Sequence, residues 1–428
     1  MKTPVKLFVV CALLVTGTAL HAQEEFSFST QIRPRAEYRN GTLFPRDAGD
    51  GAVFFVNTRA RLSMEYKRSD LIMKLSGQHV GVWGQDPQIE KEGRFMLNEA
   101  WLQLPFGNGF FVKAGRQQLS YDDDRILGTL DWNTSGRWHD ALKVGYENKI
   151  RSAHLLLAYN QKIEPYAGMD YSYTDAQPYK TMQGLWYKEQ IGKKFNISAL
   201  FLNLGLVPGS ASSSPVDVKY MQTMGTNLNF VTSDWNLYGT FYYQTGKNAQ
   251  KQKVEAWMWA FKADYKLNDT WKLTVGSDWL SGDNHPTEGT YKAFNPLYGT
   301  HHKFYGAMDY YYASGFLSGM APGLWDNQLG VSFKASKDVV LQANYHLFSS
   351  TTDPKDRWLT SDLGKSLGSE LDLTIDWQIR KDVKLSGGYS VYFGTATMEM
   401  YKGGSQDSWQ DWGWVSLNVN PRVFISKW

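Results

Sequence analysis

Cysteine is almost missing from this 428-residue chain, because Cys11 is the only one. Such a chain cannot form an internal disulfide, and beyond Cys11 it has no thiolate for a metal. Long apolar runs are missing after residue 22, so no segment there could form the roughly 20-residue helix that spans a membrane. Charge of one sign is not in excess either, since 45 Lys and Arg stand against 42 Asp and Glu. These absences exclude a disulfide scaffold, a multi-helix membrane protein and a strongly basic nucleic-acid binder.

The N-terminus has the pattern of a cleaved secretory signal. Lys2 and Lys6 precede an apolar stretch from Leu7 to Leu20, and Ala22 supplies a small residue before the expected cleavage. We predict a signal peptide over residues 1–22 and one mature domain over residues 23–428. An uncleaved anchor is the alternative, but the apolar stretch is short for a membrane span. Loss of Lys2 and Lys6 would reduce the formal charge from +3 to +1.

Alternation of apolar and polar residues with period two dominates the rest of the chain. In the first segment Phe26, Phe28 and Ile32 fall on one face, whereas Arg33 and Arg35 fall on the other. Strands of soluble sandwiches average about 5 or 6 residues, but these segments run over about 10 to 14. Strands of that length cross a membrane when they are tilted. The pattern therefore predicts an all-β membrane protein.

Eighteen such segments can be placed, an even number as a closed bacterial barrel requires. They cover residues 25–39, 53–66, 70–84, 94–104, 109–118, 137–147, 150–161, 180–189, 194–205, 218–231, 234–245, 253–266, 270–281, 325–335, 338–348, 368–380, 382–394 and 411–428. Short turns alternate with long loops, of which residues 282–324 form the longest. We expect that loop to fold over or into the mouth. The predicted fold is a single transmembrane antiparallel β-barrel of about 18 strands, with short periplasmic turns and long extracellular loops.

Aromatic residues are abundant, with 17 Trp, 25 Tyr and 22 Phe. Amphipathic rings near strand ends are typical of the girdles that mark both membrane interfaces. We assign Trp83, Trp101, Trp138, Trp186, Tyr187, Trp257, Trp259, Trp279, Trp377, Trp412 and Trp414 to these girdles, with core packing as the alternative for any one ring. The apolar faces between the girdles should meet lipid, and we expect this of Leu62, Leu75, Leu102, Val112, Leu373 and Val415. The C-terminal Phe424 to Trp428 resembles the assembly signal of outer-membrane barrels.

The polar faces would then line a pore. Arg33, Arg35, Arg39, Arg59 and Arg61 lie on the polar faces of the first two strands and predict a basic ladder. Guanidinium groups stay charged and present forked donors that match carboxylates, so this ladder would attract anionic solutes. An ion-pair network that braces the wall is the alternative. The opposite wall is expected to be acidic, through Asp264, Asp278, Asp326, Glu370, Asp372 and Asp376.

A dense motif runs from Gly115 to Asp140. It reads Gly-Arg-Gln at 115–117, Leu-Ser-Tyr at 119–121, Arg125, Gly128, Asp-Trp at 131–132 and Gly-Arg at 136–137. This run resembles the alginate-export family of outer-membrane porins. The resemblance implies an 18-stranded, monomeric barrel with an arginine-rich constriction for a polyanionic sugar, and it adds Arg116, Arg125 and Arg137 to the substrate-contacting residues expected from the ladder, Arg33, Arg35, Arg59 and Arg61.

Metal and catalytic chemistry have weaker signals. Asp122, Asp123 and Asp124 could bind a structural Ca²⁺, but the EF-hand spacing is absent and solvated acids paired with Arg116 and Arg125 are the alternative. The pairs His139-Asp140 and His301-His302 lack the spacing of a zinc site, and no nucleophile elbow or phosphate loop occurs. We therefore expect no catalytic residue and no cofactor.

The favoured function is an outer-membrane channel that passes anionic, alginate-like polysaccharide or oligosaccharide through an arginine-lined pore. A less selective diffusion porin is the first alternative, and a barrel enzyme the second. The expected partners are outer-membrane lipid, lipopolysaccharide and an anionic sugar, with no nucleic acid.

Overall fold

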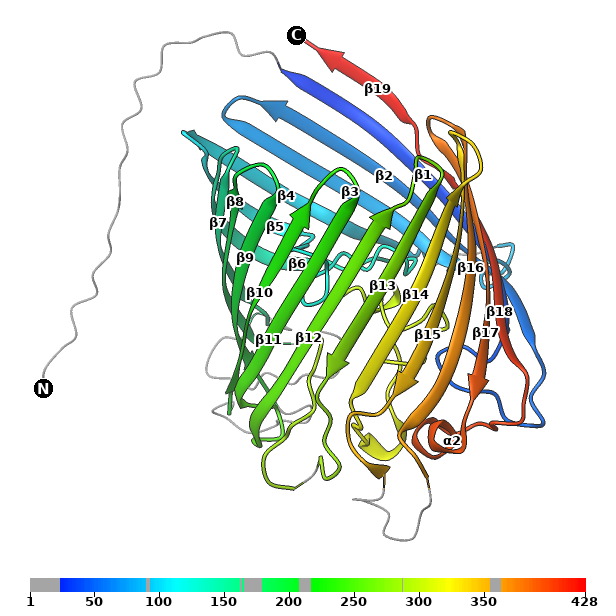
Figure 1. Ribbon diagram of the computed structural model, residues 1–428. Coiled ribbons are helices and arrows are strands. Elements are labelled where there is room, and N and C mark those ends of the chain that lie inside the picture. The colour runs from blue at the N-terminus through cyan, green and yellow to red at the C-terminus, as the bar shows by residue number, and fades with distance from the viewer. Residues whose placement is uncertain are drawn as a thin grey trace, which may run out of the picture.

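The computed structural model describes residues 24–89, 93–161, 164, 179–207, 217–286, 288–354 and 363–428, so the predicted signal peptide lies outside the described residues. Within these ranges the chain forms one antiparallel sheet that closes on itself (Figure 1). The strands are β1 (Glu25–Asn40), β2 (Val53–Arg68), β3 (Leu71–Val82), β4 (Phe95–Gly107), β5 (Phe110–Gln117), β6 (His139–Glu147), β7 (Arg151–Tyr159), β8 (Thr181–Ile191), β9 (Phe195–Leu206), β10 (Lys219–Val231), β11 (Trp235–Lys247), β12 (Lys253–Lys266), β13 (Trp271–Leu280), β14 (Leu324–Lys334), β15 (Val339–Ser349), β16 (Ser366–Arg380), β17 (Val383–Gly394), β18 (Gln410–Val419) and β19 (Arg422–Lys427).

The last two strands, β18 and β19, together occupy a single strand position in the barrel. β18 pairs with β1 from Ile32 to Asn40, and β19 pairs with β1 from Glu25 to Ser29. Pro421 lies between them and has no N–H to give to the ladder, which explains the interruption. Its carbonyl still accepts a hydrogen bond from the Thr30 N–H at 3.1 Å. The described barrel is therefore 18-stranded, as the alternation predicted.

Strand register confirms the period-two faces. The large apolar side chains of Leu62, Leu75, Leu102, Leu373 and Val415 are exposed on the outside, between 40% and 54% of their full area. Val112 lies directly opposite the outward Leu104 in the β4–β5 pair and so shares that face. In a barrel, outward apolar side chains of this kind meet lipid.

The predicted aromatic girdle is correct only in part. Trp83, Trp257 and Trp377 are exposed on the outside, and the Trp257 and Trp279 rings stack at 4.0 Å. Four other members face inward, namely Trp101, Trp186, Trp412 and Trp414, because they pair with inward positions of neighbouring strands. These four rings pack inside the barrel and do not contact the membrane interface.

The connections divide the barrel into two ends. The short turns lie at the top of Figure 1, together with the start of β1 and the C-terminus, and helix α2 (Ala396–Lys402) lies at the other end, where the described parts of the long connections leave the strands. Short turns are periplasmic in barrels of this type. No helix within the described residues is long and apolar enough to cross a membrane.

Candidate functional site: the charged interior of the barrel

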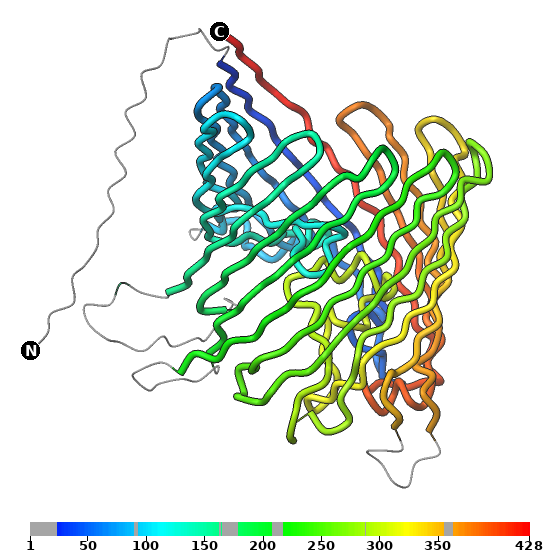
Figure 2. The backbone as a smooth tube through the Cα atoms, turned by 60° about the vertical axis from the view of Figure 1, so that its left-hand side comes forward, coloured from blue at the N-terminus to red at the C-terminus, as the bar shows by residue number. Residues whose placement is uncertain are grey.

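Two long connections fold into the barrel. They are residues 118–138, between β5 and β6, and the described residues 281–286 and 288–323, between β13 and β14, and we call them together the internal partition (Figure 2). Leu127 and Tyr298 form a short parallel bridge between them. The Tyr298 N–H donates to the Ile126 carbonyl at 3.0 Å, and the Gly128 N–H donates to the Tyr298 carbonyl at 2.9 Å. The longest loop was predicted to fold over or into the mouth, and its described residues do fold inward, since the Met308 N–H donates to the buried Glu370 of β16 at 2.8 Å.

A small apolar core holds the partition together. Leu119, Ile126, Leu127, Phe294 and Met308 are each at most 2% exposed, although they belong to connections and not to strands. Burial of one such side chain contributes about 1.5 to 3 kcal/mol, so the partition has a packed interior of its own. This burial rigidifies the polar residues that the partition carries.

The basic face of β1 and β2 points inward and contacts the partition. Arg33 and Arg59 both reach Asp131, at 3.1 Å and 2.8 Å from its two carboxylate oxygens. Arg35 donates to the Trp132 carbonyl at 2.8 Å, and its guanidinium lies 3.9 Å from the centre of the Trp132 ring. These contacts tie residues 131–132 to the wall.

The other arginines of this face have neighbours on the wall itself. Arg61 donates two hydrogen bonds to the side-chain oxygen of Gln78, at 2.9 Å and 2.7 Å. Arg39 and Arg35 both pair with Glu37 at 2.8 Å. The same group of arginines therefore both holds the wall together and carries positive charge into the interior of the barrel.

The charges of this group do not cancel. Five guanidiniums, those of Arg33, Arg35, Arg39, Arg59 and Arg61, share only the carboxylates of Glu37 and Asp131. Five positive charges against two negative ones leave an excess of three within this described group. Low-dielectric walls focus such an excess into the aqueous interior.

Arg125 lies at the far side of the partition. Its two terminal nitrogens donate to the Asp278 carboxylate of β13 at 2.7 Å and 3.0 Å, and its Nε donates to Asp123 at 2.7 Å. Burial opposes the charge, but the two carboxylates outweigh burial and raise the pKa of Arg125. This buried, bidentate pair fastens the partition to β13.

Arg137 and Arg116 complete the predicted set. Arg137 donates to the Gly299 carbonyl at 2.8 Å and so links the two halves of the partition. Arg116 lies opposite Ala100 and Asp140 in the ladders, on the outward face of the wall, and it pairs bidentately with Asp140 at 2.9 Å and 3.0 Å. This position differs from that of a pore-lining residue, because Gly115 and Gln117 take the inward positions beside it.

The acids of the opposite wall are also occupied. Asp326 contacts His346 at 2.9 Å, Asp372 accepts from Ser390 at 2.5 Å, and Glu370 accepts from the Met308 N–H at 2.8 Å. Asp264 and Asp376 accept from the Thr274 and Ser386 hydroxyls, each at 2.6 Å. The expected acidic wall is therefore present but hydrogen-bonded, and it holds the partition through Asp278 and Glu370.

The three consecutive aspartates diverge. Asp122 accepts from Ser198 and Trp186, Asp123 from Arg125, and Asp124 from Ser120. Burial raises the pKa of Asp122, and its two hydrogen bonds oppose that rise. No group of three or more metal-ligating side chains is found within the described part of the chain.

The histidine pairs serve as packing and hydrogen-bonding groups. His139 Nδ1 lies 2.8 Å from the Tyr179 hydroxyl, and His302 contacts Asp309 at 2.8 Å while its ring stacks on Trp132. Burial lowers the pKa of His301 to about 4, so this ring is neutral at pH 7.

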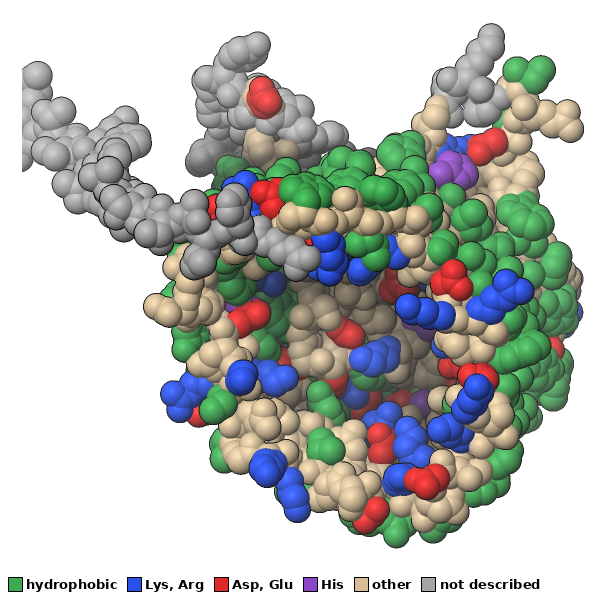
Figure 3. All heavy atoms as spheres, turned by 90° about the horizontal axis from the view of Figure 1, so that it is seen from above, with side chains coloured by type: hydrophobic (Ala, Val, Ile, Leu, Met, Phe, Trp, Pro, Cys, Tyr) green, Lys and Arg blue, Asp and Glu red, His purple; other side chains and the backbone are tan. Residues whose placement is uncertain are grey.

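Open space remains on the short-turn side of the partition. A view from the short-turn end shows a deep hollow with charged side chains of both signs around it (Figure 3). One cavity of about 300 Å³ is lined by Lys262, Lys272 and Lys303 together with Gln342 and Asn344. The alternation along β12 and β13 predicts that Lys262 and Lys272 face inward. Lys303, in contrast, reaches the cavity only because its loop folds inward.

Comparisons with known proteins agree with this architecture. The family described as alginate export matches residues 48–407. OccAB4 of Acinetobacter baumannii has a similar structure, with a TM-score of 0.60 at 11% identity, covering 95% of this chain and 98% of that one. OccK2 (OpdF) of Pseudomonas aeruginosa, solved in complex with glucuronate, gives a TM-score of 0.60 at 11% identity over 93% and 98%. A BenF-like porin from Pseudomonas fluorescens Pf-5 gives 0.62 at 11% identity over 92% and 98%.

The comparison with curated proteins gives no match. The family match covers far more than half of the chain, and the solved structures share its barrel. This chain therefore belongs to the alginate-export family and forms a channel-type β-barrel of the bacterial outer membrane.

Proposed function

We propose that this channel passes anionic saccharides of the uronate type, and that the arginines of β1 and β2 provide its anion preference. The observation that carries the proposal is the charge excess of that face, where five guanidiniums share two carboxylates. Guanidinium groups match sugar carboxylates in geometry and keep their charge at all physiological pH values. The family match to alginate export supports the same class of solute.

The way in which the arginines act follows from their contacts. Arg33, Arg35 and Arg59 are held against residues 131–132, so they act mainly through their field, which focuses anions into the hollow. Arg61 contacts only Gln78 in this group and keeps its charge uncompensated by a direct carboxylate partner. Passage requires attraction that is strong enough for entry and weak enough for release, and a distributed field meets both conditions.

Reversal potentials in planar bilayers test the proposal. The wild-type channel should prefer anions at low salt, and Arg61→Gln should reduce the anion-to-cation permeability ratio by about two-fold, because one partly screened charge is lost. Arg61→Lys should retain the preference. Lys337→Gln, which removes a positive charge from an exposed turn, is the matched control and should change nothing.

Salt gives a second readout of the same proposal. The preference should shrink at 1 M salt, where the Debye length falls to about 3 Å. A wild-type channel with no anion preference at low salt would be a general diffusion porin instead. An unchanged ratio in Arg61→Gln would remove this residue from the selectivity mechanism.

A further inference from the structure

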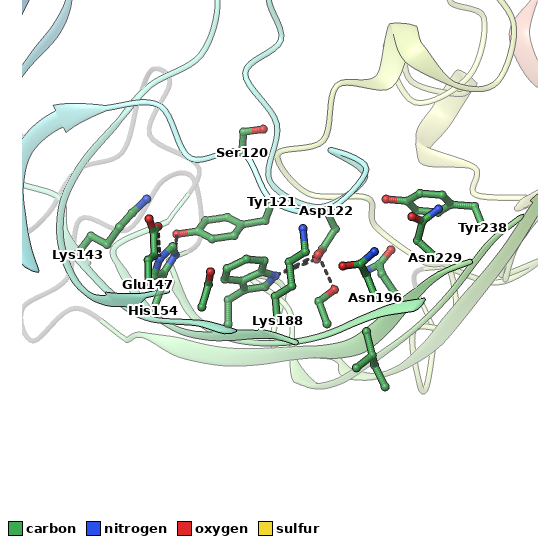
Figure 4. Close-up of a pocket in the computed structure, with 15 residues that line it drawn as sticks. Ser120, Tyr121, Asp122, Lys143, Glu147, His154, Lys188, Asn196, Asn229 and Tyr238 are labelled. Carbon is green, nitrogen blue, oxygen red and sulfur yellow. Dashed lines mark hydrogen bonds and ion pairs between the residues drawn. The ribbon is translucent and has the colours of Figure 1, made fainter. Parts of the chain in front are cut away.

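A cavity separate from the arginine face lies between the partition and the wall formed by β6 to β11. We call it the side pocket. It has a volume of about 400 Å³ and is lined by Ser120, Tyr121 and Asp122 of the partition and by Lys143, Glu147, Ser152, His154, Trp186, Lys188, Asn196, Ile197, Ser198, Asn227, Asn229 and Tyr238 of the strands (Figure 4). Ligand pockets in proteins measure about 300 to 1,000 Å³, so the volume suits a small ligand.

The side pocket lies toward the periplasmic end. Lys188 is near the end of β8, Asn196 is near the start of β9, and Asn229 and Tyr238 face each other across the β10–β11 pair close to their short turn. A solute in the barrel would meet this pocket on the short-turn side of the partition.

The two acids of the side pocket are already engaged. Asp122 accepts from the Ser198 hydroxyl at 2.5 Å and from the Trp186 indole N–H at 3.1 Å. Glu147 contacts His154 Nε2 at 2.8 Å, and His154 Nδ1 in turn contacts the Tyr121 hydroxyl at 3.0 Å. These contacts fix the floor of the pocket.

The two cations of the side pocket lie in the field of its two acids, Lys143 near Glu147 and Lys188 near Asp122, but neither is in direct contact with a carboxylate. Neither Lys143 nor Lys188 makes an ion pair with any side chain in the described ranges. Lys143 lies with its ammonium 5.2 Å from the centre of the Tyr121 ring, and Lys188 is exposed to the cavity. The two lysines come from inward positions of β6 and β8, but Lys143 lies opposite Leu156 of β7 and Lys188 opposite Ser152, so they are also staggered by four residues, roughly 13 Å, along the strands.

Neutral donors and acceptors continue the lining beyond Lys188. The register places Ser152 opposite Lys188, and Asn196 opposite Asn229, so their polar groups form rows across neighbouring strands. In Figure 4 Lys143 and Tyr238 stand at opposite ends of the cavity, with Lys188 and Asn196 between them. A cation in the middle of the cavity, with amides and a phenol on one side of it, matches a ligand that carries both a carboxylate and several hydroxyls.

We propose that the side pocket is a binding subsite for one acidic sugar unit of the transported saccharide, with Lys188 pairing its carboxylate and Asn196, Asn229 and Tyr238 bonding its hydroxyls, while Lys143 adds positive charge at the far end of the cavity. This inference rests on the proposed function, because it assigns a place to the same class of solute. Lysine ammonium groups on flexible stems suit transient capture, since they hold a carboxylate without the fixed bidentate geometry of arginine. The subsite would retain a saccharide on the periplasmic side of the partition.

Single-channel recording with the full-length protein tests the subsite. A short oligouronate added to the short-turn side should interrupt the wild-type current, and a neutral glucose oligomer of matched length should interrupt it far less. Lys188→Gln should shorten the interruptions about ten-fold, because loss of a charge-assisted hydrogen bond typically weakens binding by that factor. Lys337→Gln, in an exposed turn, should behave as wild type.

A second variant protects the test against misfolding. Asn196→Asp adds a negative charge where a sugar hydroxyl is expected, and it should also shorten the interruptions. Interruptions that are unchanged in both variants, or absent from an anion-selective wild type, would overturn the subsite and leave the proposed function intact. Loss of anion selectivity in the wild type would instead overturn the proposed function.

Discussion

At the scale of single residues, this barrel places charged side chains where they serve structure and solute at once. Arg59 is completely buried yet keeps a 2.8 Å contact with Asp131, and Arg125 is 5% exposed between two carboxylates. Buried charges of this kind are tolerated only with partners, because desolvation is expensive. Removing one partner of such a pair should therefore lower the free energy of unfolding more than removing both.

Arg125→Leu should destabilise the protein by about 3 to 5 kcal/mol, because Asp278 would stay buried without its partner. The partition would also lose its fastening to β13, so open-channel conductance should rise. Urea unfolding in lipid vesicles and single-channel recording measure the two effects. The double variant Arg125→Leu/Asp278→Leu should recover part of the stability. A double variant no more stable than the single one would argue against an uncompensated charge as the cause.

Lys402 gives a pH dependence at the extracellular end. Its ammonium donates to the Ser314 hydroxyl at 2.7 Å and to the Gly315 carbonyl at 2.6 Å, with the rings of Phe44 and Phe316 nearby. Burial lowers its pKa to about 7, whereas an unfolded lysine has a pKa of about 10.4. Between these values the open form binds a proton that the docked form lacks, so docking of α2 becomes more stable as pH rises.

Hydrogen-exchange protection factors of Ala396–Lys402 should therefore increase from pH 7 to pH 9. Lys402→Met should have high protection at both pH values, because it carries no titrating group. An equal rise in the variant would assign the pH effect to a different residue.

At the scale of elements, alternation decides which substitutions the wall accepts. Leu373 and Thr374 are neighbours on β16, but Leu373 is 43% exposed on the outside while Thr374 lines an interior cavity. A charge at mid-membrane depth on the lipid face costs about 2 to 4 kcal/mol. Leu373→Arg should therefore reduce the yield of folded barrel, and Thr374→Arg should not. Heat-dependent gel mobility of the outer-membrane fraction measures the folded yield. Similar losses in both variants would contradict the lipid-facing assignment.

The partition is the element that controls the size of the opening. Replacing residues 284–320 by a short flexible linker should increase conductance, because this stretch fills the interior with Phe294, Met308 and Tyr310. Deleting the exposed residues 47–50 from another long loop is the control and should leave conductance unchanged. Equal conductance for the linker variant and the wild type would mean that the solute path avoids this half of the partition.

At the scale of the whole molecule, most of the barrel was readable from the sequence and most of its interior was not. Period-two alternation located all eighteen strands of the barrel to within a few residues, because one face of each strand must be apolar to contact lipid. The same alternation predicts the orientation of Arg116, because this residue lies four positions after Val112 and so shares its outward face. The family motif alone had suggested that Arg116 lines the pore, whereas the alternation along β5 places it on the outside.

The inward folding of residues 118–138 and 281–323 had no such periodic signal. Their contacts depend on residues far apart in sequence, such as Arg125 with Asp278 and Arg59 with Asp131. The length of the second loop predicted entry into the mouth, but no local pattern predicted its bridge to Leu127. Lys143 and Lys188 were not among the predicted site residues for a related reason, because the pocket that they line forms only where the partition packs against the wall.

The two ends of residues 125–131 grip different walls, one on β13 through Asp278 and the other on β1 and β2 through Asp131. Around the 18-stranded ring β13 lies six strands from β1 and seven from β2, so the segment spans the lumen as a chord. A hoop with a chord resists flattening along the direction of that chord. Lateral pressure from a thicker or stiffer bilayer should therefore leave the cross-section almost unchanged, and the channel should conduct alike in membranes of very different mechanical character.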